Sequence, residues 1–423
     1  MSVTVVGIGA DGWPGLAAPA RTACEKAAVV LGAPRQLDLL PGTVTARREE
    51  WPAPLMPSLP GLLDRLGGDE LVVLASGDPM FFGIGTSVLR LRPDAVVVPH
   101  PSSVALACGR LGWAEQDVVV LSAVGRPLEA VRAALAPRRR LLVLADSGAL
   151  PGRLAALLVG AGYGGSALTV LGSLGAEHES RVEGVAATWD APEGDPLAVV
   201  AIDCPALPDD GWLGRAPGLP DAAYAHDGQL TKTEMRALSV AALRPLPGQL
   251  LWDVGGGAGS IGIEWCRAEP TARGIAVEAR DDRAARITAN AAALGVPGLR
   301  VVPGSAPEVL AGLEAPDAVF VGGGVSAPGM LEACRRALRP GGRLVANAVT
   351  VEGEAALAAA RTEYGGELRR VAVSRGRPVG RYLGWKALAP VTQWVLHVRG
   401  GDARSAPDTG DVPPPTPPPW RQR

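Results

Sequence analysis

The stretch LLWDVGGGAGSIGIEW, residues 250–265, decides the fold of the second half of this 423-residue chain. It starts with an apolar run typical of a buried strand, continues through five residues of which four are glycine, and resumes with apolar residues at helical spacing. Glycines let the backbone turn tightly and approach a ligand, while the first amide groups of a helix point toward that ligand. The stretch therefore predicts a strand, a ligand-binding loop and a helix in that order.

Two glycine patterns overlap in this loop and predict different cofactors. The pattern D-x-G-x-G-x-G, typical of S-adenosylmethionine (SAM) sites, uses Asp253, Gly255, Gly257 and Gly259. The dinucleotide pattern G-x-G-x-x-G uses Gly257, Gly259 and Gly262, and it indicates a nicotinamide-dependent oxidoreductase. The dinucleotide pattern starts three residues beyond the strand, although its tight-turn glycine should follow the strand at once. We therefore favour SAM.

The rest of the second half is regular. Five strand-like runs alternate with helix-like runs between residues 249 and 364, and two extended segments follow near residues 368–374 and 392–398. This alternation predicts a mainly parallel, doubly wound α/β sheet closed by antiparallel strands. Glu278 ends the second strand-like run, where its carboxylate suits a ribose diol in either glycine pattern.

The first half also reads as α/β. Short apolar runs alternate with helix-like stretches, and from residue 167 the strand-like runs follow with less helix between them. We expect a sheet with mixed strand directions near residue 197. This domain is predicted to span residues 1–203.

The boundaries follow from proline and glycine. Residues 204–223 hold four prolines and three glycines without a sustained period, so they are predicted to be a linker. The second domain is then residues 224–400. Six of the seven residues 413–419 are proline, so residues 401–423 are expected to be a disordered tail.

Composition excludes several classes of protein. The 41 basic and 43 acidic residues leave a net charge of −2, which is not that of a protein bound to nucleic acid by bulk charge. Five scattered cysteines form no CxxC pair and four histidines show no metal-ligand spacing, so we expect no metal site and a reduced cytoplasm. The first residues do not read as a signal peptide, and residues 147–176, with one charge but eight glycines, read as buried α/β structure rather than a membrane span.

Motifs in both halves resemble known families. The second half resembles the decarboxylating corrin-ring methyltransferases of cobalamin biosynthesis through TKTEMRAL (231–238), DVGGGAGSIGIE (253–264), GSAPEVL (304–310), FVGGG (320–324), NAVTVE (347–352) and PVTQW (390–394). The first half resembles the tetrapyrrole methylase family through VGIGADG (6–12), SGDPMFFGIG (76–85), the pair Ser102 and Ser103, and AVVAID (198–203).

The resemblance implies a fused enzyme with a tetrapyrrole methylase fold followed by a Rossmann-like class I methyltransferase fold. Two SAM sites, a tetrapyrrole polycarboxylate substrate and a homo-oligomer are expected. The first half would methylate C-5 of precorrin-6B, and the second would methylate C-15 and remove the C-12 acetate carboxyl to give precorrin-8X. The alternatives are a cobalt-precorrin substrate, the nicotinamide-dependent oxidoreductase, and a binding scaffold in which one half has lost turnover.

The resemblance also implies cofactor-binding residues. In the second half the loop would hold the amino-acid end of SAM, Glu278 the ribose, and Ser305 and Ala306 the adenine. The full set there is Thr231, Gly255, Gly256, Gly257, Ala258, Gly259, Glu278, Ser305 and Ala306. Thr231 is otherwise explained as a helix N-cap. In the first half the set is Gly7, Gly9, Gly77, Asp78, Pro79, Met80, Ser102 and Ser103.

The catalytic residues stay unassigned. Methyl transfer is an in-line displacement in which the protein mainly aligns the reactants, and a reduced tetrapyrrole can supply its own electrons, so no strong protein base is required. A polycarboxylate needs positive charge, and Arg375 and Arg377 are the candidates, although the same loop can simply be solvated. Asn347, at the end of a strand, is expected to face the cleft or to cap a turn.

Overall fold

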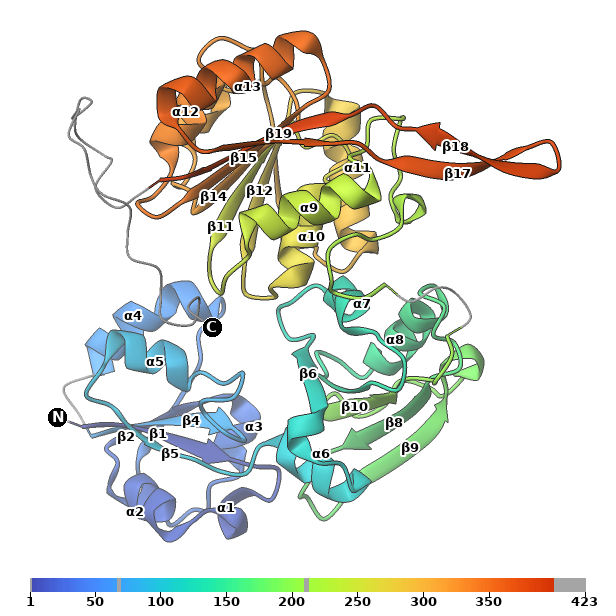
Figure 1. The fold of residues 1–423 in the computed structure, drawn as a ribbon. Helices are drawn as coiled ribbons and strands as arrows, with labels where there is room; N and C mark the ends of the chain where they lie inside the picture. The colour runs from blue at the N-terminus through green and yellow to red at the C-terminus, as the bar shows by residue number, and fades with distance from the viewer. Residues whose placement is uncertain (1, 67–69, 209–212, 399–423) are drawn as a thin grey trace, which may run out of the picture. The chain divides into compact units, whose positions relative to one another are not determined.

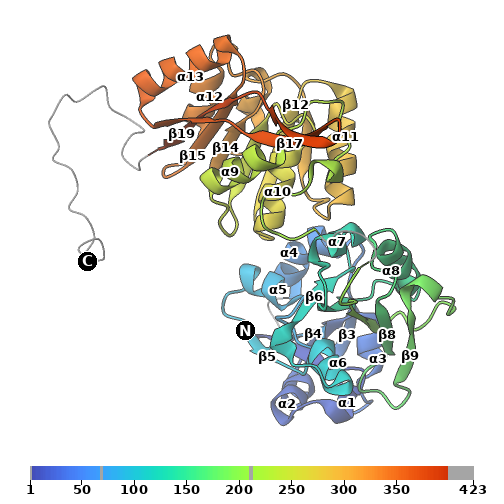
Figure 2. The same cartoon turned by 45° about the vertical axis from the view of Figure 1, so that its right-hand side comes forward.

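The computed structural model describes residues 2–66, 70–208 and 213–398. The chain divides into two compact units, Met1–Leu213 and Gly214–Arg423, which are drawn in Figures 1 and 2. The predicted tail, residues 401–423, lies outside the described residues. No helix in the described ranges is both long enough and apolar enough to span a bilayer.

The first unit contains two five-stranded sheets. One is parallel throughout, in the order β3-β2-β4-β1-β5, and the other is mixed, in the order β6-β7-β10-β8-β9. Strand β10 is antiparallel to both of its neighbours, which confirms the predicted mixture of directions. The strands are β1 Val3–Ile8, β2 Val29–Gly32, β3 Arg47–Glu50, β4 Leu71–Ser76, β5 Val96–Val98, β6 Val118–Ser122, β7 Arg140–Leu144, β8 Ala167–Gly172, β9 Ser180–Val185 and β10 Ala198–Asp203.

Short helices connect these strands. Residues 147–176, which carry one charge, form a helix and strand β8, as their interpretation as α/β structure predicted. The α-helices are α1 Gly12–Gly15, α2 Ala18–Lys26, α3 Pro34–Asp38, α4 Leu55–Leu66, α5 Gly85–Leu91, α6 Ser103–Leu111, α7 Val131–Ala134 and α8 Leu150–Val159. The 3-10 helices are η1 Glu115–Asp117, η2 Leu128–Ala130 and η3 Ala186–Thr188.

The second unit is a seven-stranded, doubly wound sheet in the order β13-β12-β11-β14-β15-β19-β16. Strands β11 to β15 are parallel, and β19 runs antiparallel between β15 and β16, as the closing segments predicted. The strands are β11 Leu250–Val254, β12 Arg273–Glu278, β13 Arg300–Pro303, β14 Ala318–Val321, β15 Arg343–Ala348, β16 Glu367–Val371, β17 Ser374–Val379, β18 Tyr382–Ala387 and β19 Val391–His397.

Helices cover both faces of this sheet (Figure 1). Side chains of α12 and α13 pack with Trp252 on one face, and side chains of α9 and α10 pack with Leu251 on the other. Strand β11 is buried on both faces, and this burial explains why its apolar residues run on without alternation. The helices are η4 Asp221–Ala223, α9 Thr233–Leu243, α10 Ser260–Ala268, α11 Asp281–Ala293, η5 Glu308–Gly312, α12 Met330–Ala337 and α13 Val351–Tyr364.

Two features of the second unit differ from the sequence prediction. One of the helix-like runs in the predicted alternation, residues 306–313, is the short 3-10 helix η5, because Pro307 and Gly312 leave only four residues between them. The hairpin β17–β18 was not predicted. It projects from the sheet, as Figure 1 shows, and exposes most of its side chains.

A buried ion pair ties the start of the second unit to its helices. Glu264 of α10 accepts hydrogen bonds from the Arg236 Nε (2.6 Å), the Leu219 amide (3.0 Å) and the Tyr224 hydroxyl (3.0 Å), and also from the amide of Gly218. Both members of the pair are at most 1% exposed. Residues 214–223 of the expected linker therefore belong to the packed second unit.

Replacing Glu264 by alanine should destabilise the second unit by about 3–5 kcal/mol, because it removes one of the two carboxylates paired with the buried Arg236 and leaves the buried donors of Leu219 and Tyr224 without their acceptor. Urea unfolding combined with hydrogen exchange of peptides from residues 214–243 measures this. The control is Glu332→Ala, which removes an exposed pair with Arg336 and should cost under about 1 kcal/mol. Equal losses in the two variants would contradict the structural role of the pair.

Candidate functional site

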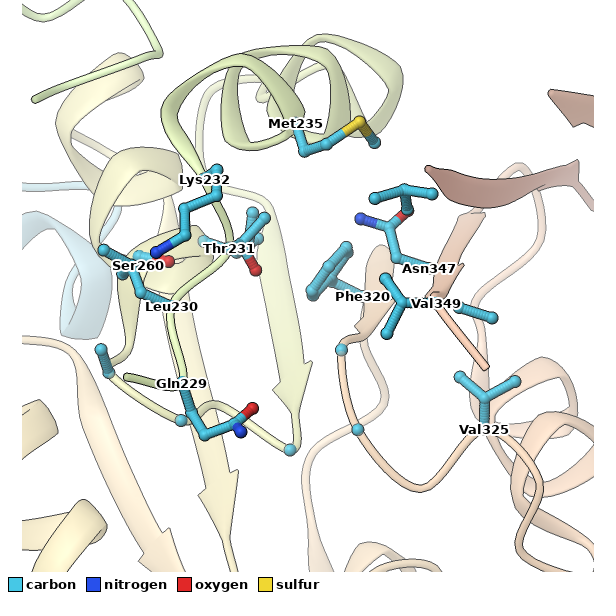
Figure 3. Close-up of a pocket in the computed structure, with 18 of the residues that line it drawn as sticks. Gln229, Leu230, Thr231, Lys232, Met235, Ser260, Phe320, Val325, Asn347 and Val349 are labelled. Atoms are coloured by element: carbon cyan, nitrogen blue, oxygen red, sulfur yellow. The ribbon is translucent and has the colours of Figure 1, made fainter. Parts of the chain in front are cut away.

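A cavity of about 580 Å³ opens in the second unit where the strand order reverses between β11 and β14 (Figure 3). Ligands of doubly wound sheets bind at this switch point, outside the carboxyl ends of the strands. The glycine loop after β11 and residues 322–326 after β14 form two walls, and residues 228–235 and 347–350 form the others. Figure 3 shows Leu230 and Thr231 across the cavity from Phe320 and Val349.

The three glycines of the SAM-type pattern have different roles. Gly255, Gly257 and Gly259 all have positive φ angles, between 60° and 77°. A Cβ on Gly255 would lie 2.8 Å from the Gly323 amide nitrogen, and one on Gly259 would lie 2.6 Å from Ile287, so these two permit close packing. A Cβ on Gly257 would meet nothing nearer than the Gln229 carbonyl oxygen at 3.7 Å. Gly257 is therefore the glycine that leaves open space for a ligand.

Two carboxylates hold the loop. Glu278 is 6% exposed and accepts hydrogen bonds from the amides of Gly257 (2.9 Å) and Arg280 (3.1 Å). Asp253 is 1% exposed and accepts from the amide of Gly262 in α10 (2.9 Å). Burial raises the pKa of Asp253 to about 7, and the charge of Glu278 adds to this rise while the Gly262 hydrogen bond opposes it.

The structure gathers part of the predicted set around the cavity. Thr231, Gly255, Gly256, Gly257, Ala258 and Asn347 line it. Gly259, Glu278, Ser305 and Ala306 do not. The Asn347 side chain donates to the Ser239 hydroxyl (3.0 Å) and accepts from the Gln393 amide (3.0 Å), so it is fixed at the cavity wall.

The two arginine candidates are not brought to the cavity. Arg375 of β17 pairs with Glu234 (2.6 Å) and with Asp221 (3.0 Å), and these hydrogen bonds hold its pKa above the usual value. It joins the hairpin to the body of the unit. Arg377 lies on the exposed part of β17 and is absent from the cavity lining. Neither arginine therefore belongs to the lining of this cavity, although Arg375 contacts it through Glu234.

The first unit has a cavity of about 380 Å³ at the carboxyl ends of β1 and β4. Gly9, Gly77, Asp78, Ser102 and Ser103 of the predicted set line it, whereas Gly7, Pro79 and Met80 do not. A Cβ on Gly7 would lie 2.3 Å from the Gly77 carbonyl oxygen, so Gly7 is a packing residue.

Side chains order the loops around this first-unit cavity. Ser102 caps α6 by accepting from the Ala105 amide (3.0 Å). Asp78 accepts from the Met80 amide (2.8 Å) and so closes the turn that follows β4. Both hydrogen bonds join residues that are close in sequence, and both order the backbone beside the cavity.

Sequence reasoning missed three cations that line the cavities, of which Arg283 pairs with Asp227. Arg35 lies in the first cavity and donates to the Ser76 hydroxyl (3.0 Å). It follows strand β2, so its place at a strand's carboxyl end was the available signal. Lys232 lies in the second cavity, next to Thr231 in a motif that had already been singled out.

The raised pKa of Asp253 predicts a pH dependence of stability. The folded state binds the Asp253 proton up to about pH 7, whereas the unfolded chain releases it near pH 4, so the free energy of unfolding should fall as pH rises between these values. In Asp253→Asn this contribution should vanish, because the amide does not titrate. Urea unfolding at pH 4.5 and pH 7.5 measures the difference. If the free energy of unfolding of Asp253→Asn depended on pH as strongly as that of the wild type and of the exposed control Asp282→Asn, the contribution of Asp253 would be contradicted.

Both units of the chain match known families. Residues 2–189 match the family model for Tetrapyrrole (Corrin/Porphyrin) Methylases, and residues 222–398 match the model for the Precorrin methyltransferase domain. A crystal structure of the C-terminal domain of precorrin-6Y C5,15-methyltransferase from Rhodobacter capsulatus is 45% identical, with a TM-score of 0.42, and the alignment covers 44% of this chain and 100% of that one.

Curated relatives extend the match. The probable cobalt-precorrin-6B C(15)-methyltransferase (decarboxylating) of Pyrobaculum calidifontis is 36% identical over 187 residues, which are 43% of this chain and 95% of that protein. The precorrin-6Y C(5,15)-methyltransferase (decarboxylating) of Sinorhizobium sp is 48% identical over 394 residues, which are 93% of this chain and 95% of that protein. These matches set aside the nicotinamide-dependent alternative and confirm the resemblance. The chain belongs to the family of decarboxylating precorrin-6Y C(5,15)-methyltransferases, enzymes whose methyl donor is SAM.

Proposed function

We propose that the chain methylates metal-free precorrin-6B at C-5 and C-15 and removes the C-12 acetate carboxyl, which gives precorrin-8X. The observation that carries this proposal is the presence of a separate glycine-lined cavity in each unit, at the carboxyl ends of parallel strands. The full-length relative from Sinorhizobium is named for a precorrin rather than a cobalt-precorrin, which supports a substrate without metal.

The second cavity fits SAM. Its floor is backbone, with room at Gly257, and its walls include the apolar side chains of Leu230, Phe320 and Val325. SAM supplies an electrophilic methyl group when bound. The chain supplies shape and order: Glu278 and Asp253 hold the loop through backbone amides, and Asn347 is fixed by its two hydrogen bonds. Such fixed positioning is the main requirement of an in-line transfer.

The ionisable groups of this cavity favour a reaction that needs no strong protein base. Among the described residues, those lining it are Lys232, Glu234, Asp253 and Arg283. Glu234 is paired with Arg375, and burial favours the neutral form of Asp253. Electrons released by loss of carbon dioxide from an acetate can pass into a conjugated imine of the tetrapyrrole itself. The protein then has to hold the substrate and exclude water.

We assign C-5 methylation to the first unit, which contains the predicted first domain, residues 1–203. The second unit carries C-15 methylation and decarboxylation. The Pyrobaculum relative supports this division, because its name combines C(15) methylation with decarboxylation in a protein that aligns with only 43% of this chain. Both activities therefore fit within the length of one unit.

We further propose a homo-oligomer in the cytoplasm. The β17–β18 hairpin exposes Val379 (63%), Tyr382 (66%), Leu383 (79%) and Trp385 (82%). A cluster of large apolar side chains on a projecting hairpin favours contact with another protein surface. The five cysteines are free thiols, which is consistent with a reducing compartment.

The full chain should bind two equivalents of SAM, one in each unit, and Gly257→Val should bind one. A valine at Gly257 would project into the ligand's space at a φ of +60°. Gly341→Val is the matched control, since Gly341 has a φ of +82° and open space around its Cβ but lies outside the cavity lining. Titration calorimetry counts the equivalents. One equivalent in the wild type would contradict two sites.

Products of two full-chain variants test the division of labour. With precorrin-6B and SAM, Gly257→Val should add at most the C-5 methyl group and release no carbon dioxide. Gly77→Val, at a φ of +58° in the first cavity, should still add the C-15 methyl group and release carbon dioxide. Mass spectrometry of the products reads both results. Carbon dioxide release by Gly257→Val, or its loss only in Gly77→Val, would contradict the assignment.

A further inference from the structure

Lys232 is an unpaired cation at the second cavity. Two basic side chains line this cavity, Lys232 and Arg283. The Nε of Arg283 donates to Asp227 at 2.8 Å, so its charge is already partnered. Lys232 forms no ion pair or hydrogen bond through its side chain with any described residue and is half-buried. It is also one of only three lysines among the 41 basic residues of the chain.

Helix stability does not explain this lysine. Lys232 occupies the N-cap position of α9 and makes no side-chain capping hydrogen bond. A lysine cannot accept from the first amides of a helix, and its charge has the unfavourable sign at the N-terminal end. Asp221 performs the capping instead, because its carboxylate accepts from the Thr233 amide at 2.9 Å. The lysine side chain is therefore left to face the cavity.

Further donors without acceptors lie at the same end of the cavity. Ser260, the first residue of α10, lines the cavity and is 3% exposed, and its hydroxyl has no hydrogen-bond partner among the described residues. Figure 3 shows the amine end of Lys232 pointing toward Ser260. The N-terminal amides of a nine-residue helix such as α10 favour an anion as well.

No acidic side chain of the cavity is free to occupy these donors. Both carboxylate oxygens of Glu234 accept from Arg375, at 3.0 and 2.6 Å. Asp253 accepts from the Gly262 amide on the buried side of the loop. The donors at Lys232 and Ser260 are therefore available to an anionic group of a ligand.

We propose that Lys232, the Ser260 hydroxyl and the start of α10 form a subsite for a ligand carboxylate. The inference rests on the proposed function and deepens it. Two ligands of this cavity carry carboxylates: the amino-acid end of SAM, and the acetate and propionate arms of the tetrapyrrole. An ammonium group and a hydroxyl suit either one, because a charge-assisted hydrogen bond is the strongest contact available to a carboxylate.

The test compares ligands with and without the carboxylate. Hydrogen exchange of peptides covering residues 250–265 in the full chain reports the affinity of the second unit alone, for SAM and for 5′-methylthioadenosine, which lacks the amino-acid end. If the subsite holds SAM, Lys232→Met should weaken SAM about 10- to 100-fold and leave 5′-methylthioadenosine unchanged. Ser260→Ala should act in the same direction, and Lys232→Arg should restore most of the affinity.

If the subsite holds the tetrapyrrole, SAM affinity should stay unchanged in Lys232→Met, while the KM for the substrate of the decarboxylating step rises at least tenfold at similar kcat. Lys26→Met, at an exposed site on α2 of the first unit, is the matched control and should change none of these values. Unchanged SAM affinity together with unchanged KM would overturn the subsite, as would equal weakening of SAM and 5′-methylthioadenosine. Failure of the wild type to bind SAM at residues 250–265 would instead overturn the proposed function.

Discussion

The buried pair of Arg236 and Glu264 sets the geometry on which the second unit's cavity depends. Arg236 also donates to the carbonyl oxygens of Thr231 and Leu219, so one guanidinium fixes the segment that forms a cavity wall. Glu264 lies on α10, the helix that begins at the glycine loop. Through this pair the wall and the floor of the cavity are held by the same two side chains, and a shift of either one separates a buried charge from a partner.

The two units bring their strand ends together with the same backbone device, a glycine packed against the neighbouring loop. In the second unit, Gly255 lets the loop after β11 touch the loop after β14, and Gly257 is the one of the three pattern glycines that leaves space for a ligand. In the first unit, Gly7 lets the end of β1 approach Gly77 after β4. In both cases a packing glycine brings two strand ends together, and the cavity opens beside that contact. A glycine in such a motif is therefore as often a condition for packing as a ligand contact.

Much of this architecture could be predicted from local pattern. Strand β11, its loop and α10 follow from residues 250–265, because apolar runs, glycines and helical spacing are each local signals. The packing of residues 214–223 could not be predicted, since their prolines and glycines indicate a loop and their acceptor, Glu264, is distant in sequence. Arg375 likewise appeared free for substrate because nothing in its neighbourhood reveals that Glu234 and Asp221 lie beside it. Lys232 was overlooked because the sequence suggested Thr231 as the N-cap, whereas Lys232 itself occupies that position in the structure.

The central claim is that one chain performs two methyl transfers and one decarboxylation on a single tetrapyrrole. The most direct measurement is high-resolution mass spectrometry of the product formed by the full-length wild-type chain from precorrin-6B and labelled SAM. Two methyl transfers and one decarboxylation give a product that carries two labelled methyl groups and has lost one carbon dioxide. A product with a single methyl group and all its carboxyl groups, at complete conversion, would contradict it.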